Sequence, residues 1–300
     1  MSLLCVGTLA FDKIETPFAK RDEALGGSAT FFALAASHFA PVRLVGVVGT
    51  DFPDEQLVSF RERGIDTDGV EIAEGKTFRW AGRYEADWNT RVTLDTQLNV
   101  FEHFEPKVPD SYRDSKFLFL GNASPEVQMQ ALEQCTRKDR FVMADTMNLW
   151  IEIARPGLEQ LLGKIDALVL NDEEARMLTG ENHLISAARK VLEMGPKFVV
   201  LKKGEHGAFL IGKDVHFAIP AYPVDQVVDP TGAGDSFAGG FMGYLASVDN
   251  IDGATMKRAM LYGTVTASHC VEGFSIEPLE AVGRAGIERR FNEFHGLVSV

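Results

Sequence analysis

One stretch, from Asp229 to Phe237, combines small residues and carboxylates in a pattern that suits anion binding and proton transfer. It reads Asp-Pro-Thr-Gly-Ala-Gly-Asp-Ser-Phe, and apolar residues continue at helical spacing: Phe237, Phe241, Tyr244 and Leu245. The spacing predicts a helix that begins inside the stretch. The N-terminus of this helix would consist of the small residues Gly232, Ala233 and Gly234. Unpaired backbone N–H groups and the helix dipole attract negative charge there. Asp235, in the first turn beside this anion hole, could take a proton from a substrate hydroxyl.

The same stretch has simpler interpretations. An acidic residue in a first helical turn often serves only the helix dipole, and glycines there often only permit a turn. A dinucleotide-binding fingerprint would need a third glycine where Phe237 stands, and it would follow the first strand of the chain. A Walker-type loop would need a Gly-Lys-Ser/Thr ending, which the stretch lacks. The last two interpretations are disfavoured, and the first stays open.

Elsewhere, short apolar runs alternate with segments of helical periodicity, which predicts a mostly parallel α/β sheet. The runs are Leu3 to Val6, Val42 to Val48, Phe117 to Leu120, Phe141 to Ala144, Ala167 to Leu170 and Phe198 to Leu201. Most of them end in a small or polar residue: Gly7, Gly49, Gly121, Asp145, Asn171 and Lys202. Because open α/β sheets bind ligands at the carboxyl edge of their strands, we expect a site there.

Between Phe78 and Val100 the even positions are mostly apolar and the odd positions mostly charged or polar, a period of two. With a turn near Asp87 to Thr90, this predicts a long hairpin, and an extended piece near Ile14 to Phe18 could pair with it. The hairpin is either an edge extension of the main sheet or a lid over the site. Its length favours the lid.

Composition limits the classes of partner. The 300 residues are 45% apolar, enough for one large core, so we expect one main domain. A formal net charge of −13 leaves no basic field for nucleic acid or an anionic membrane. Three widely spaced cysteines, no basic leader and no run of about 18 apolar residues favour a reducing, cytoplasmic location.

The stretch from Asp229 to Asp235 resembles the second signature of the ribokinase-like (PfkB) carbohydrate kinases, an Asp-Thr-x-Gly-Ala-Gly-Asp run that opens a long helix. Further landmarks of that family recur in order: Gly7 and Asp12, Gly26 and Gly27, Asn171 with Glu174, and Gly204 with Gly207. The resemblance implies a three-layer α/β/α ribokinase-like fold, with residues 1–300 as a single kinase domain. A small β-sheet lid would come from segments at about residues 12–26 and 76–102.

The resemblance also implies roles for individual residues. Asp12 would bind substrate hydroxyls, while Gly26 and Gly27 would join the lid to the core and let substrate come close. Asn171 would lie near the nucleotide phosphates, and Glu174 would organise Mg²⁺ through water. Asn171 and Glu174 also have the spacing of a helix capping box, and both interpretations can hold together.

A loop that lies against the nucleotide is implied near Lys202. This lysine is a candidate phosphate contact, and Gly204 and Gly207 follow it in the loop. The two glycines fit a simple hairpin turn equally well.

Two further pairs of residues match weaker features of the family. Asp229 and Thr231 match positions that hold a monovalent cation, K⁺, in some relatives. Asp145 and Asn148 resemble an Asp-Pro-Asn element at a strand end, although their spacing is three residues instead of two. The role of this second pair stays open.

The chain departs from the family at Phe31, where many sugar kinases have an asparagine that contacts sugar hydroxyls. An aromatic ring cannot replace those hydrogen bonds. Either the pocket is then less polar and suits a nucleoside base or a cyclitol by stacking, or another residue such as Asn99 or Asn122 supplies the polar contact. Alternatively, Phe31 and Phe32 simply pack their helix into the core.

The resemblance therefore implies an ATP-dependent phosphotransferase that uses Mg²⁺. It would move the γ-phosphate of ATP to a hydroxymethyl group of a small sugar-like molecule, with Asp235 as the base. A nucleoside kinase of the same superfamily is the nearest alternative. A ligand-binding protein without activity is another, because fold similarity does not guarantee chemistry. The apolar face of residues 78–100 would also allow a homodimer through the lid.

Overall fold

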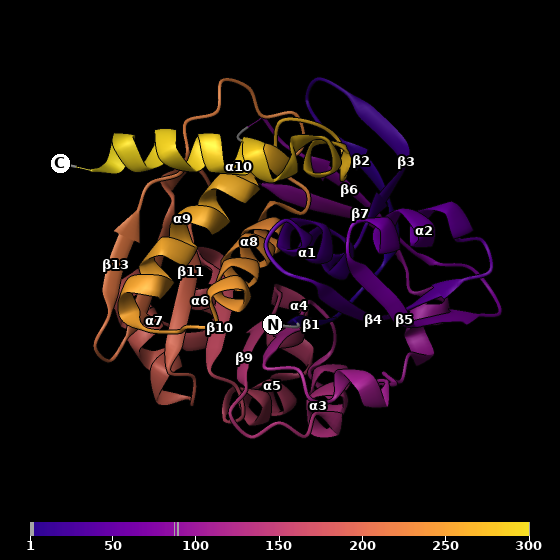
Figure 1. The fold of residues 1–300 in the computed structure, drawn as a ribbon, viewed down its shortest axis with the longest axis horizontal. Helices are drawn as coiled ribbons and strands as arrows, with labels where there is room; N and C mark the ends of the chain where they lie inside the picture. The colour runs from indigo at the N-terminus through magenta and orange to yellow at the C-terminus, as the bar shows by residue number, and fades with distance from the viewer. Residues whose placement is uncertain (1–2, 87, 89, 300) are drawn as a thin grey trace.

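The computed structural model describes residues 3–86, 88 and 90–299. In this part of the chain thirteen strands form two separate sheets (Figure 1). The larger sheet has the order β13-β12-β11-β10-β9-β8-β1-β4-β5. Its strands are β1 (Leu3–Val6), β4 (Val42–Gly49), β5 (Ile65–Ala73), β8 (Phe117–Leu120), β9 (Phe141–Asp145), β10 (Ala167–Asn171), β11 (Phe198–Lys202), β12 (Ala208–Gly212) and β13 (His216–Ile219). Neighbours pair in parallel from β5 to β11, and β12 and β13 add in antiparallel fashion.

The predicted apolar runs all fall on strands of the larger sheet, so the mostly parallel α/β prediction is confirmed. Strands β5, β12 and β13 were missing from the prediction. Strands β5 and β13 are the two edges of the sheet, where no continuous apolar run is needed, whereas β12 does contain an apolar run that the prediction omitted. Polar residues interrupt β5 in particular, at Asp66, Asp68 and Glu71.

Helices cover both faces of the larger sheet (Figure 1). One buried cluster joins the sheet to α1 (Ser28–Ser37), α2 (Asp54–Glu62), α8 (Ala233–Val248), α9 (Gly253–Cys270) and α10 (Glu277–Val298). A second cluster joins the opposite face to α3 (Pro125–Gln134), α4 (Asn148–Ile153), α5 (Arg155–Leu162), α6 (Asp172–Thr179) and α7 (Leu184–Glu193). The predicted three-layer α/β/α arrangement is therefore confirmed.

The smaller sheet, which we call the lid, has the order β3-β2-β6-β7. Its strands are β2 (Ala10–Glu15), β3 (Lys20–Gly26), β6 (Phe78–Tyr84) and β7 (Arg91–Gln97). The predicted hairpin is thus present, although Asp87 and Asn89 of its turn lie outside the described residues. The predicted extended piece at Ile14 to Phe18 was wrong in its bounds. Thr16 instead begins a turn, with its N–H donating to the Ala19 carbonyl, before β3 starts.

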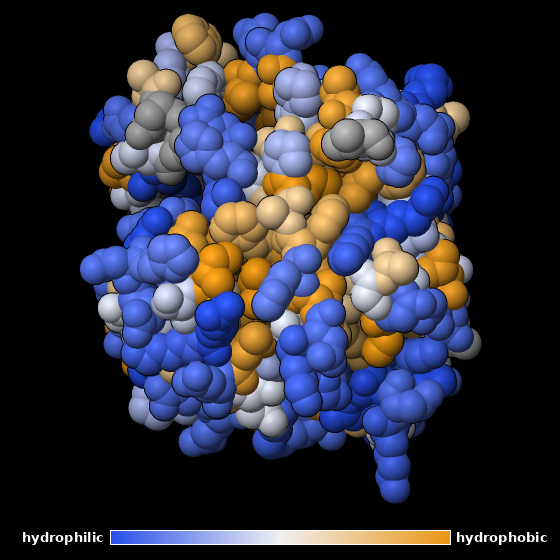
Figure 2. Space-filling view, turned by 90° about the vertical axis from the view of Figure 1, so that its left-hand side faces the viewer, coloured by the Kyte–Doolittle hydropathy of each residue, from blue (hydrophilic) through white to orange (hydrophobic). Residues whose placement is uncertain are grey.

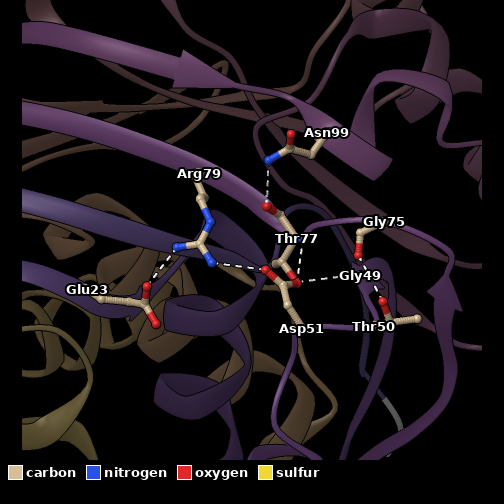
Figure 3. A network of polar contacts seen from close by, with 8 residues as sticks. All are labelled: Glu23, Gly49, Thr50, Asp51, Gly75, Thr77, Arg79 and Asn99. Atoms are coloured by element: carbon tan, nitrogen blue, oxygen red, sulfur yellow. Dashed lines mark hydrogen bonds and ion pairs between the residues drawn. The ribbon is translucent and has the colours of Figure 1, made fainter.

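A polar network ties the lid to the core where the two meet (Figure 3). Arg79 of β6 bridges Glu23 of β3, at 2.8 Å, and Asp51 of the loop after β4, at 2.9 Å. Asp51 also accepts hydrogen bonds from the amide and the hydroxyl of Thr77, at 2.7 and 2.6 Å. Because Asp51 follows a strand of the larger sheet whereas Glu23 and Arg79 belong to the lid, this network connects the two sheets.

The end of the larger sheet that carries β13 has a partly apolar surface. Seen from the left-hand side of Figure 1, apolar residues gather across the middle of this face and hydrophilic residues surround them (Figure 2).

Among the described residues, no helix combines the length and the apolar character needed to cross a membrane.

The ring of Phe32 gives a direct test of the core between α1 and the sheet. It stacks on Phe119 of β8 with ring centres 3.9 Å apart, and it is fully buried. Phe32→Ala should lower the free energy of unfolding by ~3–5 kcal/mol, through lost contacts and the cavity left behind. Urea unfolding measures this, with Phe18→Ala as the matched control, because Phe18 is 76% exposed. Equal effects of the two substitutions would contradict the packing described here.

Candidate active site

Helix α8 begins where the sequence predicted, at the small residues before Asp235. Its first residue is Ala233, and the N-cap residue Gly232 has a φ of 75°, in the left-handed region that favours glycine. A Cβ at position 232 would lie 2.3 Å from the ring of Phe31, so this ring packs directly beneath the loop. Phe31 is only 1% exposed, which matches the packing alternative for Phe31 and Phe32. The Ala233 amide donates to the Pro230 carbonyl at 3.2 Å.

Lys202, at the end of β11, places its ammonium group at the N-terminus of α8. A Cβ at Gly234 would lie 2.7 Å from the lysine Nζ, and the Nζ is 3.9 Å from Oδ1 of Asp145. Burial lowers the pKa of Lys202, but Asp145, Glu174 and Asp235 raise it and the net shift is upward. A retained positive charge therefore lies beside the positive end of the helix dipole, a combination that attracts an anion.

Asp235 lies in the first turn of α8 and titrates near neutrality. Burial and the charge of Asp145 raise its pKa to about 7, while Lys202, its own backbone amide and Arg91 act in the opposite direction. A carboxyl with a pKa near the working pH is well matched to accept a proton and later release it.

Asn171 and Glu174 form the predicted capping box at the start of α6. The Asn171 side chain accepts from the Glu174 amide at 2.8 Å, and the Glu174 side chain accepts from the Asn171 amide at 2.7 Å. Burial and the nearby Asp145 raise the pKa of Glu174 to about 7, and Lys202 lowers it. Both residues lie at the carboxyl edge of the sheet, beside Asp145 and Lys202, as the strand ends predicted.

Asp12 lies on β2, on the lid, and is 5% exposed. Burial raises its pKa to about 8, with further increases from Asp229 and Asp235 and opposite effects from Arg91 and the Gly27 amide. A Cβ at Gly26 would lie 1.9 Å from Oδ2 of Asp12, and one at Gly27 would lie 2.4 Å from the Thr8 carbonyl oxygen. The two glycines therefore let the end of β3 approach β2 closely enough to enclose this carboxyl.

Asp229 connects the loop before α8 to the segment after α9. Its carboxylate accepts from the amides of Thr231, at 2.9 Å, and Ser275, at 3.3 Å. Burial raises its pKa, and the hydrogen bonds from these two residues lower it. The Thr231 hydroxyl donates to the Tyr84 hydroxyl of β6 at 3.2 Å, so the lid contacts the loop just before the anion hole.

The two asparagines predicted as substrate contacts both have partners within the protein. Asn99 donates to the Thr77 carbonyl at 2.9 Å, within the network of Figure 3. Asn122 donates to the Met147 sulfur at 3.2 Å and accepts from the Trp150 indole at 2.9 Å. Their role toward a substrate stays a prediction.

The glycines after Lys202 form the turn between β11 and β12. Gly204 and Gly207 have φ angles of 53° and 81°, and a Cβ at position 207 would lie 2.0 Å from the Ile219 carbonyl oxygen. The hairpin-turn interpretation is therefore confirmed, and contact with a nucleotide stays a prediction.

Two charged residues of the site had no assigned role in the sequence analysis. Asp145 lies against Lys202, and its position at a strand end was the available signal. Arg91 opens β7 of the lid, and its charge lowers the pKa values of Asp12, Glu174 and Asp235. Nothing in the local sequence marks Arg91, because only the folding of the lid over the core brings it near these carboxyls.

A three-layer α/β/α core with a second small sheet, and a buried carboxyl beside a helix N-terminus and a lysine ammonium group, are compatible with phosphoryl transfer to a small molecule. The chain belongs to the pfkB family of carbohydrate kinases, whose family model matches residues 14–278. It is accordingly a carbohydrate or nucleoside kinase.

Similar proteins support this assignment. A cytidine kinase from Thermococcus kodakarensis is 32% identical over 81% of this chain and 87% of its own length. A nucleoside kinase from Methanothermobacter thermautotrophicus is 28% identical over 90% of this chain and 89% of its own. A solved structure of a putative ribokinase II from E. coli with ATP and Mg²⁺ has a TM-score of 0.81, at 19% identity over 97% of this chain and 99% of its own. The kinase assignment replaces the alternative of a protein without activity, and the ribokinase-like fold is confirmed.

Two glycine substitutions should separate the two ends of the site. Gly26→Ala would force the Asp12 carboxyl away, and Gly234→Ala would displace the Lys202 ammonium. We expect Gly26→Ala to raise KM for the acceptor and Gly234→Ala to raise KM for ATP. Each should lower kcat/KM on the order of 10²-fold, the effect of a misplacement of about 1 Å. Steady-state kinetics with each substrate varied in turn measures both. Gly157→Ala, whose Cβ would meet only ordinary contacts, is the control.

The pKa of Asp235 predicts the pH dependence of activity. A carboxyl with a pKa of about 7 is protonated below that pH, so kcat/KM should fall as the pH drops through 7 on the expectation that Asp235 is the base. Lys202→Met removes a charge that lowers this pKa and should move the fall to higher pH. Rate profiles between about pH 5 and 9 measure the shift, with Lys164→Met on the surface as the control. A shift to lower pH in Lys202→Met would contradict this account of the site.

Proposed function

We propose that this kinase transfers the γ-phosphate of Mg-ATP to a hydroxymethyl group of a small sugar-like or nucleoside acceptor, with Asp235 as the catalytic base. One observation carries the proposal. Asp235, with a pKa of about 7, lies in the first turn of α8, beside the ammonium group of Lys202. Base and anion site therefore occupy one helix end, where an attacking hydroxyl and a phosphoryl group would meet.

The transfer follows from these positions. Asp12 holds hydroxyl groups of the acceptor. Asp235 accepts the proton of the attacking hydroxyl while the oxygen of that hydroxyl forms a bond to the γ-phosphorus. The bond between that phosphorus and the bridging oxygen of ADP breaks, and ADP carries away the electron pair. The proposed donors to the transferring group are the amides of Gly232 and Gly234, because the Ala233 amide already donates to Pro230 and the Asp235 amide interacts with its own carboxyl.

The proposed nucleotide site lies at the carboxyl ends of β10 and β11. Asn171, Lys202 and the turn from Gly204 to Gly207 are the proposed contacts. Residues 3–86, 88 and 90–299 contain no group of three or more His, Cys, Asp or Glu side chains able to cage a metal ion. Mg²⁺ commonly binds through one or two carboxylates plus phosphates and water, and Glu174 is the proposed protein contact. When bound, Mg²⁺ supplies charge neutralisation of the phosphates.

A monovalent cation, K⁺, is proposed at Asp229 and Thr231. Asp229 is buried, and burial raises its pKa. A cation beside this carboxyl would favour its ionised form and hold the loop that precedes the anion hole.

The proposed assembly and location rest on the lid surface and the cysteines. Strand β7 is an exposed edge of the lid with apolar side chains at Val92 and Leu94, which suits a homodimer through the lid. The cysteines at positions 5, 135 and 270 are all free and buried, as expected in the reducing cytoplasm.

Asp235→Asn tests the base. The amide keeps the size of the side chain but cannot accept the proton, so turnover should fall on the order of 10²-fold or more. ADP release is measured across ribose, fructose, 2-keto-3-deoxygluconate, myo-inositol, adenosine, inosine and cytidine. Cytidine is the first nucleoside to try, since the 32% identical relative is a cytidine kinase.

Asp214→Asn is the matched control, because Asp214 lies in the exposed turn before β13 and should leave turnover unchanged. Near-normal turnover in Asp235→Asn would rule out this residue as the base. Absence of ADP release from the unmodified protein with every acceptor would count against the proposed acceptor class.

A further inference from the structure

The carbonyl group of Thr231 lies one residue before Gly232, and it accepts a hydrogen bond from a buried thiol. Sγ of Cys270, the last residue of α9, donates to the Thr231 carbonyl oxygen at 3.5 Å, and this cysteine is fully buried. The amide of Thr231 donates to Asp229, and its hydroxyl donates to Tyr84 of the lid. Each polar group of Thr231 therefore has a partner, and the partners belong to a helix, the lid and the loop itself.

The direction of the Thr231 carbonyl also sets the direction of the next amide. The peptide bond between Thr231 and Gly232 is trans and planar, so its C=O and N–H groups point in opposite directions. Because the carbonyl points at Cys270, the Gly232 N–H points away from α9. Within the described part of the chain this N–H has no hydrogen-bond partner, and Gly232 is partly exposed. The amide is therefore available to a ligand.

The thiol is a fixed point, because α9 packs tightly against α8. A Cβ at Gly240 of α8 would lie 2.5 Å from Oγ1 of Thr266, and one at Gly263 of α9 would lie 2.8 Å from the Phe237 carbonyl oxygen. Two helices packed this closely have little room to shift against each other. The end of α9 therefore keeps its distance from the start of α8.

The thiol of Cys270 stays protonated and so remains a donor. Burial raises its pKa to about 12, the nearby Ser236 hydroxyl lowers it, and the charges of Asp229 and Asp235 raise it. The Ser236 hydroxyl is itself fully buried and makes no hydrogen bond of good geometry to the residues that the structure describes. Because a protonated thiol carries no charge, it acts on the loop through the direction of its hydrogen bond.

We infer that Cys270 is a positioning residue for phosphoryl transfer: its thiol holds the Thr231 carbonyl and thereby aims the Gly232 amide at the transferring group. The inference rests on the proposed function, in which this amide is one of the two donors at the anion hole. A donor stabilises developing charge best when it already points at the place where the charge will appear. Without the thiol, nothing on α9 would hold the peptide plane in this direction.

Two substitutions at position 270 test this role, with the best acceptor of the panel used for Asp235→Asn. Cys270→Ala removes the donor and should lower kcat about 5- to 100-fold, between the strength of one thiol hydrogen bond and the loss of one anion-hole donor. KM for ATP and for the acceptor should stay within about twofold, since the amide acts on the transition state. Cys270→Ser keeps a donor of similar size and should restore most of the loss. An unchanged kcat in Cys270→Ala, or equal losses in the two variants, would overturn the inference.

Cys135 provides a matched control on the opposite face of the larger sheet. Its thiol is also buried and also donates to a carbonyl oxygen at 3.5 Å, that of Ala131. Cys135→Ala should therefore leave kcat unchanged, while urea unfolding should show a loss of stability similar to that of Cys270→Ala. If Cys135→Ala lowered kcat as much as Cys270→Ala does, lost stability alone would explain both results and the inference would fail.

The S–H stretching band in a Raman spectrum reports the hydrogen bond without turnover. The chain has three cysteines, so Cys5→Ala with Cys135→Ala leaves Cys270 as the only thiol. We expect its band at a lower frequency than that of a free thiol, because donation weakens the S–H bond. A band at the free-thiol frequency would refute the contact and leave the proposed function intact. Absence of ADP release from the unmodified protein would instead count against the proposed function and, with it, this role of Cys270.

Discussion

The site depends on the balance between one lysine and several buried carboxyls at the edge of the larger sheet. Lys202 ends β11, Asp145 ends β9, Glu174 lies in the first turn after β10, and Asp235 lies in the first turn of α8. Burial favours the neutral form of each carboxyl, whereas the ammonium group favours the ionised form. Burial is the largest effect and the charge of Asp145 adds to it, so the pKa values of Glu174 and Asp235 are raised to about 7 although Lys202 acts in the opposite direction. A carboxyl with such a pKa exchanges a proton near neutral pH with little free-energy change.

Close packing of backbone is the second constraint, and it explains the placement of glycine. Gly234 leaves room for Lys202, Gly26 leaves room for Asp12, and Gly232 lies on the ring of Phe31. In each pair a functional or supporting side chain occupies the volume that a Cβ would fill. The glycines are therefore more than flexible links, because they set the distances between the charged groups and the helix end.

The sequence predicted the parts of this structure that local pattern controls. Continuous apolar runs identified the inner strands, and small residues followed by helical spacing located the start of α8. The same reasoning failed for edge strands such as β5, where Asp66, Asp68 and Glu71 leave no continuous apolar run. It also gave Phe31 two possible roles, because only tertiary packing shows that its ring lies under Gly232. Arg91 is a similar case, since no local feature reveals which charges a lid residue will face.

The attachments of the lid differ in strength at its two ends. Near the core, Arg79 forms ion pairs with Glu23 and Asp51, and Asp51 accepts two further hydrogen bonds from Thr77. At the far end of β6, Tyr84 accepts a hydrogen bond from the neutral hydroxyl of Thr231. Charge-assisted bonds are stronger than neutral ones, so of these two attachments the one at Arg79 is the stronger. Because Thr231 directly precedes Gly232, that contact also couples the position of the lid to the loop that forms the anion hole.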